Sequence, residues 1–273
     1  MRKYFTLLIA CRFFMAIGSL ASAQGSQHGK VTWGTPDQPW GTRRPVTAAD
    51  QRIIAGYRSG KWPTTFQSDF SNLPQFQKDW QPQSDDKAGL ASCRRPESVQ
   101  ATSQGLVLKT LAARDCKVKW STGAVVNTFQ QKYGFFEARM KVADIAGMNN
   151  AFWLTTQDRY EVDVAEVHSP SYDHLNLCNW APSVKQHTVG FGLNFPLDLS
   201  KDFHDYGVLW TPAELIFEVD GEPLAAVVTH DAIATAAKPR FSSALADFAG
   251  KVATDPVGHD MLVRSVRVIA YRQ

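Results

Sequence analysis

Short runs of β-forming residues, separated by turn residues, dominate the chain from Lys61 onward. Runs of this length and composition are typical of strands. Asp220-Gly221 joins two of them and is a strong signal for a two-residue hairpin turn. Because the strands follow one another without intervening helices, the sequence predicts an all-β fold, an antiparallel sandwich or jelly roll. The clearest runs are 106–111, 135–142, 151–154, 160–167, 206–210, 215–219 and 262–270.

Two segments depart from this pattern. Residues 24–60 are rich in Gly, Pro, Thr and Gln and show little periodicity, which predicts an irregular N-terminal arm. The single domain is then expected to span residues 61–273. Residues 229–237 are short and alanine-rich, and they are the one helix that the pattern predicts.

The first residues combine a basic start, an apolar stretch and a small-x-small ending at Ala23. This combination predicts a secretory signal peptide over residues 1–23, and therefore a secreted or periplasmic protein. Two alternatives are a lipoprotein anchored through Cys11, since residues 8–11 resemble a lipoprotein cleavage box, and an ordinary buried helix. We expect no membrane span, because every apolar run is shorter than the roughly 20 residues that a bilayer requires.

The charge balance changes once that peptide is removed. The full chain has 29 Lys and Arg against 26 Asp and Glu, a formal charge of +3, and residues 1–23 contain three bases and no acid. The mature chain is therefore formally neutral, so nucleic acid is not an expected partner. A hydrophobic content of 44% with 20% charged residues excludes a disordered chain.

Three cysteines remain after cleavage, an odd number for an oxidising compartment. Cys93 and Cys116 lie at the outer ends of a predicted hairpin, residues 97–111, so we expect them to form a disulfide. Cys178 would then be a free, buried thiol. The chain has none of the spacings typical of zinc or EF-hand sites, so the sequence predicts no metal and no cofactor.

The candidate chemistry lies in the acidic run Glu161, Asp163 and Glu166. On a regular strand the first two share a face and Glu166 points to the other, which would simply be a strand with one polar face. All three converge if a β-bulge near Val164-Ala165 absorbs one residue, as often happens beside active sites. The two glutamates would then have Cα atoms about 13 Å apart and carboxyl groups about 5 Å apart. That carboxyl spacing is typical of a retaining glycosidase.

This acidic run resembles the signature of glycoside hydrolase family 16, in the bulged form of its laminarinase, agarase and carrageenase branches. Four further segments resemble family motifs in the same order: 133–141, 151–154, 203–212 and 266–268. The resemblance covers about residues 66–271. It implies a jelly roll of two curved antiparallel sheets (concanavalin A-like), with a β-linked polysaccharide bound on the concave face and cleaved internally with retention.

The resemblance also implies roles for individual residues. Glu161 would be the nucleophile, Glu166 the general acid/base and Asp163 an assisting carboxylate. Trp153 would be the aromatic platform beside the cleaved bond, with a core tryptophan as the alternative. The family often carries a structural calcium ion, for which the sequence assigns no ligands.

Other candidates rest on weaker signals. His168 is expected to bind sugar hydroxyls or to be a structural histidine, and residues 174–178 resemble a His-x-Asn-x-His strand whose last histidine is replaced by Cys178. Trp180 and Trp120 are candidate sugar platforms, although a core position is the more usual one. We expect Glu137 and Arg139 to lie on a strand that flanks the cleft and to form a structural salt bridge there.

The sequence therefore predicts a secreted, monomeric, retaining endo-β-glycanase acting on β-1,3- or β-1,3-1,4-glucan. A neutral chain fits an uncharged polymer better than a heavily sulfated one. Three alternatives remain open: a hydrolase of a galactan such as agar, carrageenan or porphyran, a transglycosylase, and a non-catalytic carbohydrate-binding jelly roll. The intact set of three acids argues against the last of these.

Overall fold

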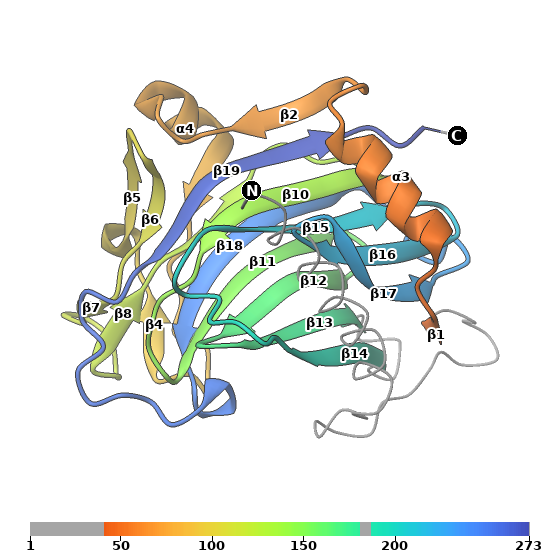
Figure 1. Cartoon of the computed structure of the whole chain (residues 1–273). Coiled ribbons are helices and arrows are strands. Elements are labelled where there is room, and N and C mark those ends of the chain that lie inside the picture. Colours follow the sequence, from red (N-terminus) through yellow and green to blue (C-terminus); the bar gives the residue numbers. More distant parts are fainter. Residues whose placement is uncertain (1–40, 181–186, 273) are drawn as a thin grey trace, which may run out of the picture.

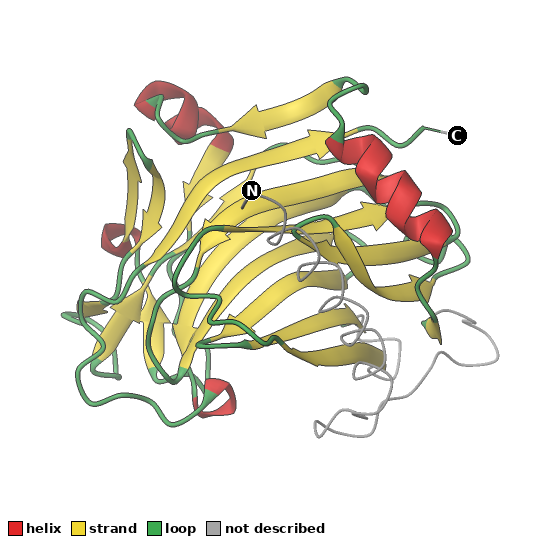
Figure 2. Cartoon of the chain, in the orientation of Figure 1, coloured by secondary structure: helices red, strands yellow, loops and turns green. Residues whose placement is uncertain are grey.

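The computed structural model describes residues 41–180 and 187–272, which form two large β-sheets packed face to face (Figures 1 and 2). The predicted all-β jelly roll is confirmed, and each of the seven predicted runs overlaps a strand. The expected signal peptide, Cys11 and the first part of the expected arm, residues 24–40, lie outside the described residues. Within the described part of the chain no helix has the length and apolar character of a membrane span.

The larger sheet has nine strands, and every neighbouring pair in it is antiparallel. In spatial order the strands are β1 (Thr42–Arg44), β17 (Glu222–Val228), β16 (Glu214–Val219), β15 (His204–Trp210), β10 (Gly134–Lys141), β19 (Met261–Ile269), β6 (Gly105–Leu108) and β5 (Val99–Thr102), with β2 (Thr64–Ser68) beside β19. The predicted hairpin turn is the one between β16 and β17, where Asp220 and Gly221 both have positive φ.

The second sheet has seven antiparallel strands and carries the acidic run at its centre. In spatial order they are β14 (His187–Asn194), β13 (Tyr172–Asn179), β12 (Tyr160–His168), β11 (Met148–Thr156), β18 (Ala237–Leu245), β9 (Ala124–Asn127) and β3 (Trp80–Pro82).

The main core lies between these two sheets. Phe136 and Phe217 of the larger sheet and Phe152 and Phe241 of the smaller one are fully buried in it, and the last two rings stack with centroids 5.0 Å apart. Because successive residues on a strand point to opposite faces, the residues between these core positions face away from the core on each sheet.

A small third sheet lies beside the larger two and contains the disulfide. Its strands are β4 (Ser92–Arg94), β8 (Trp120–Thr122) and β7 (Leu111–Ala112), and β4 and β8 run parallel. Cys93 of β4 is bonded to Cys116, which confirms the predicted pair, and the β5–β6 hairpin lies between them in the chain. Cys178 is free and buried, as expected.

The expectation of an irregular arm up to residue 60 is wrong for residues 41–60, because this stretch contains α3 (Ala48–Arg58). Thr47 and Asp50 form a capping box at its start, a signal that the pattern of Gly and Pro obscured. Ile54 and Tyr57 are buried against the outer face of the nine-stranded sheet. Among residues 41–180 and 187–272 the other helical elements are α4 (Leu73–Asp79), capped by Asn72, η2 (Pro96–Ser98) and η3 (Asp247–Ala249).

The predicted helix over residues 229–237 is also wrong. His230 and Asp231 have positive φ, and the chain turns there before β18 begins at Ala237. Asp158 fixes the rest of the segment, because its carboxylate accepts hydrogen bonds from the Ala234 amide and the Thr235 hydroxyl. Side-chain bonds to the backbone therefore outweigh the helix propensity of a short alanine-rich stretch.

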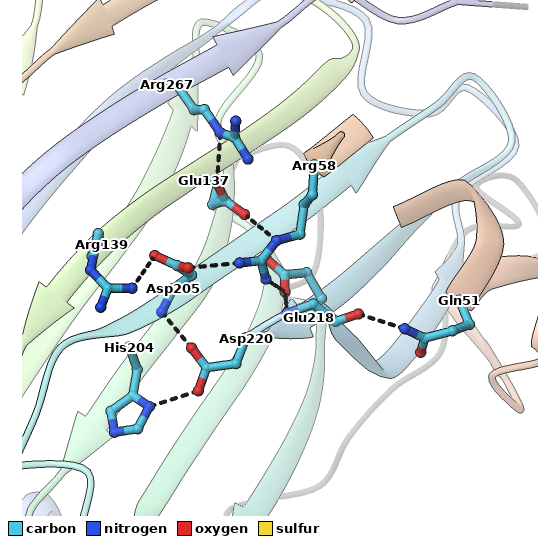
Figure 3. A network of polar contacts seen from close by, with 10 residues as sticks. Gln51, Arg58, Glu137, Arg139, His204, Asp205, Glu218, Asp220 and Arg267 are labelled. Atoms are coloured by element: carbon cyan, nitrogen blue, oxygen red, sulfur yellow. Dashed lines mark hydrogen bonds and ion pairs between the residues drawn. The ribbon is translucent and has the colours of Figure 1, made fainter. Parts of the chain in front are cut away.

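Arg58, the last residue of α3, attaches the helix to the outer face of the nine-stranded sheet (Figure 3). Its guanidinium lies 2.7 Å from a carboxylate oxygen of Asp205 and 3.3 Å from oxygens of both Glu137 and Glu218. Three carboxylates on three strands thus share one cation. Because Glu218 is fully buried, ionising its side chain there costs desolvation free energy.

Glu137 and Arg139 form salt bridges, with Arg267 and Asp205 respectively, but their predicted place beside the cleft is wrong. They alternate with the core residues of β10 and so face outward, on the side of the protein opposite to the acidic run. A pocket of 610 Å³ lies on this outer face, lined by both residues and by Arg58. Its charged groups are largely paired with one another, which favours a structural role for this pocket.

We expect Glu218→Gln to flatten the dependence of thermal stability on pH. Burial raises the pKa of Glu218 to about 8, from an unfolded value of 4.5. Its contribution to stability is therefore full below pH 4.5 and is lost as the pH rises towards about 8. The variant should lose less Tm than the wild type between about pH 6 and pH 9 in calorimetry. Exposed Glu97→Gln is the matched control, and equal slopes for Glu218→Gln and wild type would contradict this account.

Candidate active site

A β-bulge in β12 brings the three acids to one face of the seven-stranded sheet, which we call the acid face. Val164 is the extra residue, since Phe152 of β11 stands opposite Ala165 while the next residue, Trp153, stands opposite Asp163. The predicted bulge is thus present at the predicted place. The register pairs Glu161 with Thr155, Asp163 with Trp153 and Glu166 with Ala151.

This register sets the spacing of the acids. Their β11 partners are alternate residues over four strand steps, so the Cα atoms of Glu161 and Glu166 are about 13 Å apart. At this separation, glutamate side chains that lean towards each other can bring their carboxyl groups to about 5 Å. Asp163 lies between them, with a carboxylate oxygen within 4.8 Å of one from Glu161.

Asp163 is buried and is the acid that most favours its neutral form. Burial raises its pKa well above the ordinary value, and the charges of Glu161 and Glu166 add to this effect. A hydrogen bond from Asn176 of β13 opposes the shift without cancelling it. Burial and the two flanking charges therefore favour the neutral form of Asp163.

Glu161 is subject to opposing influences. Burial, then the charge of Glu166, raises its pKa. Lys87, a hydrogen bond from Trp180 and the charge of Arg240 act in the other direction and favour the carboxylate. A nucleophile must be ionised, so these three groups are the ones that support such a role.

Glu166 is held by partners on both neighbouring strands. Burial acts to raise its pKa, but His174 Nδ1, 3.2 Å from one carboxylate oxygen, and the Asn149 amide, 2.8 Å from the other, outweigh burial and lower the pKa. A Cβ at Gly190 would lie 2.7 Å from His174 Nε2, so a glycine on β14 leaves the room that the ring occupies. Neither His174 nor Asn149 was assigned a role from the sequence, although the His-x-Asn strand was the available signal.

We expect His174→Gln to move the alkaline limb of the pH–activity profile to higher pH. The limb reports loss of the proton from a general acid, and without the imidazole the pKa of Glu166 rises. The measurement is kcat/KM against pH, with exposed His259→Gln as the matched control. A limb that stays in place would show that His174 does not act on the group that titrates.

The candidate sugar platforms differ in position. Trp153 is half-buried on the acid face, and its indole donates to the Ser242 hydroxyl. Trp180 is 44% exposed and donates a hydrogen bond to Glu161, so a core position is wrong for this residue. Trp120 belongs to β8 and packs on the cluster of Met148 and Leu245, which favours a core position over a platform.

His168, at the end of β12, lines a pocket of 300 Å³. Its ring stacks on Tyr172 with centroids 5.2 Å apart and lies 5.8 Å from the ring of Phe248, which is 51% exposed. His168 also stands opposite Asn149, the partner of Glu166. The pocket therefore adjoins the acids, and its exposed aromatic ring suits the apolar face of a sugar.

Cys178 replaces the second histidine of the strand motif and lies next to the acids. Its Sγ is within 4.8 Å of carboxylate oxygens of Glu161 and Asp163, and burial raises the pKa of its thiol strongly. Asn176 and Thr188 donate hydrogen bonds to the sulfur. In the metal-free protein at neutral pH, Cys178 is thus an uncharged thiol beside the acids.

Comparison with known proteins agrees with this geometry. Residues 90–246 match Glycosyl hydrolases family 16. A laminarinase from Rhodothermus marinus superposes with a TM-score of 0.67 over 78% of this chain and 98% of its own, at 18% identity. At that identity the superposition shows the shared fold.

Curated relatives match over shorter segments. Endo-1,3-1,4-beta-glycanase EglC of Rhizobium meliloti is 32% identical over 102 residues, which is 36% of this chain and 22% of the relative. The kappa-carrageenase of Pseudoalteromonas carrageenovora is 30% identical over 128 residues, 38% of this chain and 32% of the relative. The chain thus spans about a quarter to a third of the length of these two proteins. Because the family match covers more than half of the sequence, the chain belongs to Glycosyl hydrolases family 16.

Proposed function

We propose that this protein is an endo-acting glycoside hydrolase that cleaves β-linked polysaccharide with retention of configuration. The observation that carries the proposal is the bulge in β12, because it places Glu161 and Glu166 on one face, four strand steps apart. Glutamate side chains on such positions can bring their carboxyl groups to the roughly 5 Å that a retaining enzyme needs. An inverting enzyme needs a wider gap, about 6.5–9.5 Å, to accommodate a water molecule between its carboxylates and the sugar.

In this mechanism the Glu161 carboxylate attacks the anomeric carbon, and Glu166 donates a proton to the departing glycosidic oxygen. The glycosyl–Glu161 ester is then hydrolysed by a water molecule that Glu166 deprotonates. The raised pKa of Asp163 favours its neutral form, in which it donates a hydrogen bond instead of adding a third negative charge.

The first step requires Glu166 in its protonated form, whereas His174 and Asn149 favour the carboxylate in the ligand-free protein. A bound polysaccharide removes water from the acid face, and this further burial raises the pKa of Glu166. Proton uptake by Glu166 is thus coupled to substrate binding. The hydrogen bond between His174 Nδ1 and the Glu166 carboxyl group then helps to hold this proton.

The substrate that we propose first is β-1,3- or β-1,3-1,4-glucan, the class expected from the sequence. Support comes from the names of the relatives, an endo-1,3-1,4-beta-glycanase and laminarinases. A galactan is the second candidate, supported by the kappa-carrageenase match. Transfer to a sugar acceptor is a third, since a probable xyloglucan endotransglucosylase/hydrolase of Arabidopsis thaliana is 29% identical over 106 residues.

The test is a panel of glucans and galactans, assayed for new reducing ends, with the anomer of the first-formed product followed by NMR. Release of long oligosaccharides with the β-anomer formed first supports the proposal. The α-anomer first would overturn retention. Incorporation of a labelled oligosaccharide acceptor distinguishes transfer from hydrolysis, and an inert protein would favour the carbohydrate-binding alternative.

We also propose that the protein is exported and acts as a monomer. Export rests on the signal-like residues 1–23, together with the disulfide between Cys93 and Cys116, since such bonds persist in oxidising compartments. An extracellular location fits an enzyme whose substrate is a polymer too large to enter a cell.

A further inference from the structure

Arg240 lies on the acid face, two strands away from the catalytic carboxylates. On β18 it stands directly opposite Trp153 of β11, which in turn stands opposite Asp163 of β12. With strands about 4.8 Å apart, the backbones of Arg240 and Asp163 are about 10 Å apart, roughly the width of two sugar rings. The three residues form one row across the acid face.

The guanidinium of Arg240 is fixed by neutral groups. Its central carbon lies 4.8 Å from the centroid of the Trp153 ring, and its Nε donates a 2.8 Å hydrogen bond to the Thr155 hydroxyl. These contacts hold the guanidinium beside the Trp153 ring. The two terminal nitrogens of the guanidinium, which form a fork of paired donors, take no part in these contacts.

Arg240 carries a charge that no acid of the described chain pairs with directly. Within residues 41–180 and 187–272 no carboxylate forms an ion pair with it, and Glu161 and Asp85 act on it only at longer range. Burial lowers its pKa, and the nearby charge of Arg94 does so too. A half-buried cation without a counter-charge is unusual unless a ligand supplies one.

The surroundings of Arg240 add further positive charge. Lys238, two residues earlier on β18, is on the same face, and Lys87 is close enough to act on both Glu161 and Asp163. These cations flank the carboxylates of Glu161 and Glu166, and Asp85, which also acts on Arg240, is itself paired with Arg94. Positive charge is thus concentrated beside the acids, although the mature chain as a whole is formally neutral.

We propose that Arg240 binds an anionic substituent, a sulfate ester or a carboxylate, on the sugar residue that rests on Trp153. The inference rests on the proposed function and specifies its substrate class, an anionic β-glycan in place of a plain glucan. Both substituents present oxygens that a guanidinium fork bonds in pairs. Lys238 and Lys87 contribute positive charge around the same sugar.

The test compares polymers that share a backbone and differ in charge. One pair is β-1,3-glucan and its C6-carboxylated form, and the other is kappa-carrageenan and its desulfated form. We expect Arg240→Gln to lower kcat/KM on the preferred anionic polymer by roughly 10- to 100-fold, the range for a lost bond to a charged group. The loss on the matched neutral polymer should be at least about tenfold smaller.

Two control variants sharpen the comparison. Arg240→Lys keeps the charge and loses the fork, so an intermediate loss is expected. Arg264→Gln removes an exposed arginine that also stacks on an aromatic ring, Phe203, but on the nine-stranded sheet, and it should behave as wild type. A selective loss on the carrageenan pair would indicate that Arg240 binds a sulfate ester, and a selective loss on the glucan pair would indicate a carboxylate.

Equal losses on charged and neutral polymers would overturn the proposal, because Arg240 would then act only by supporting Trp153 and Glu161. Cleavage of neutral glucans alone, without preference for either anionic form, would overturn it too while leaving the proposed function standing. If the wild type cleaves nothing, the proposed function fails. Retardation of the protein by anionic polymers in affinity gels, and its loss in Arg240→Gln, then decides the binding site separately.

Discussion

Glu161→Gln is expected to lower kcat on the polysaccharide substrate by at least about 10³-fold, equivalent to about 4 kcal/mol in the activation barrier. The carboxylate of Glu161 forms the bond to the anomeric carbon, and an amide of the same shape is a far weaker nucleophile. Binding should persist, because the side chain keeps its size and its hydrogen bond to Trp180. The loss therefore belongs in kcat rather than in KM.

The same variant should not be less stable than the wild type. Burial and the charge of Glu166 raise the pKa of Glu161, so an ionised Glu161 costs free energy in the folded protein. Calorimetry at neutral pH is expected to show an equal or higher Tm. Exposed Glu97→Gln is the control for both measurements. Retained activity with an unchanged Tm would contradict the assignment of Glu161 as nucleophile.

The strands and the bulge could be predicted because their signals are local. Asp220-Gly221 requires positive φ at two successive positions, and the five-residue offset between Glu161 and Glu166 is compatible with one shared face only if a residue is inserted. Both features follow from the chain's own geometry, whichever strand becomes the neighbour.

Helical segments were less predictable because long-range contacts decide them. Ile54 and Tyr57 make α3 stable by packing on the outer face of the larger sheet, against strands that begin more than 70 residues further along the chain. Conversely, residues 229–236 have helix-forming composition but are held in turns by Asp158. In neither case does the local sequence contain the partner that determines the conformation.

The partners of the acids also come from distant strands. His174 reaches Glu166 from β13, Asn149 from β11, and Arg240 reaches Trp153 from β18. Which side chains meet depends on strand order and register, and a one-residue slip would turn each of them to the other face. The sequence therefore predicts which acids react, but not that Glu166 is held ionised in the ligand-free protein or that a cation lies on the platform tryptophan.

Net charge proved a poor guide to the acid face. A formally neutral mature chain favours an uncharged substrate, yet Arg240, Lys238 and Lys87 place positive charge on the same side of the protein as the three acids of the acid face. Electrostatic recognition depends on the local field, which falls off over about 8 Å in physiological salt. The net charge of the whole chain does not describe this local field.

Glu166→Ala is expected to separate the two steps of the reaction. With the polysaccharide, whose leaving group needs a proton, activity should fall roughly 10²–10⁴-fold. With an aryl oligosaccharide whose leaving group is a stable phenolate, the first step needs no acid, so phenolate appears in a burst and the glycosyl–Glu161 ester accumulates. Mass spectrometry of the intact protein should show that ester.

Azide then identifies which glutamate is which, because this small anion needs no general base. Added to Glu166→Ala, it should restore turnover of the aryl substrate and yield the β-glycosyl azide, since it attacks the ester from the face that water normally uses. Added to Glu161→Ala, it takes the place of the missing carboxylate and should yield the α-azide. If Glu166→Ala gave the α-product, or no ester formed, the roles of the two glutamates would be reversed or the bulged pair would not be the reacting one. The configuration of the azide therefore reports directly on the face of the sugar that each carboxylate occupies.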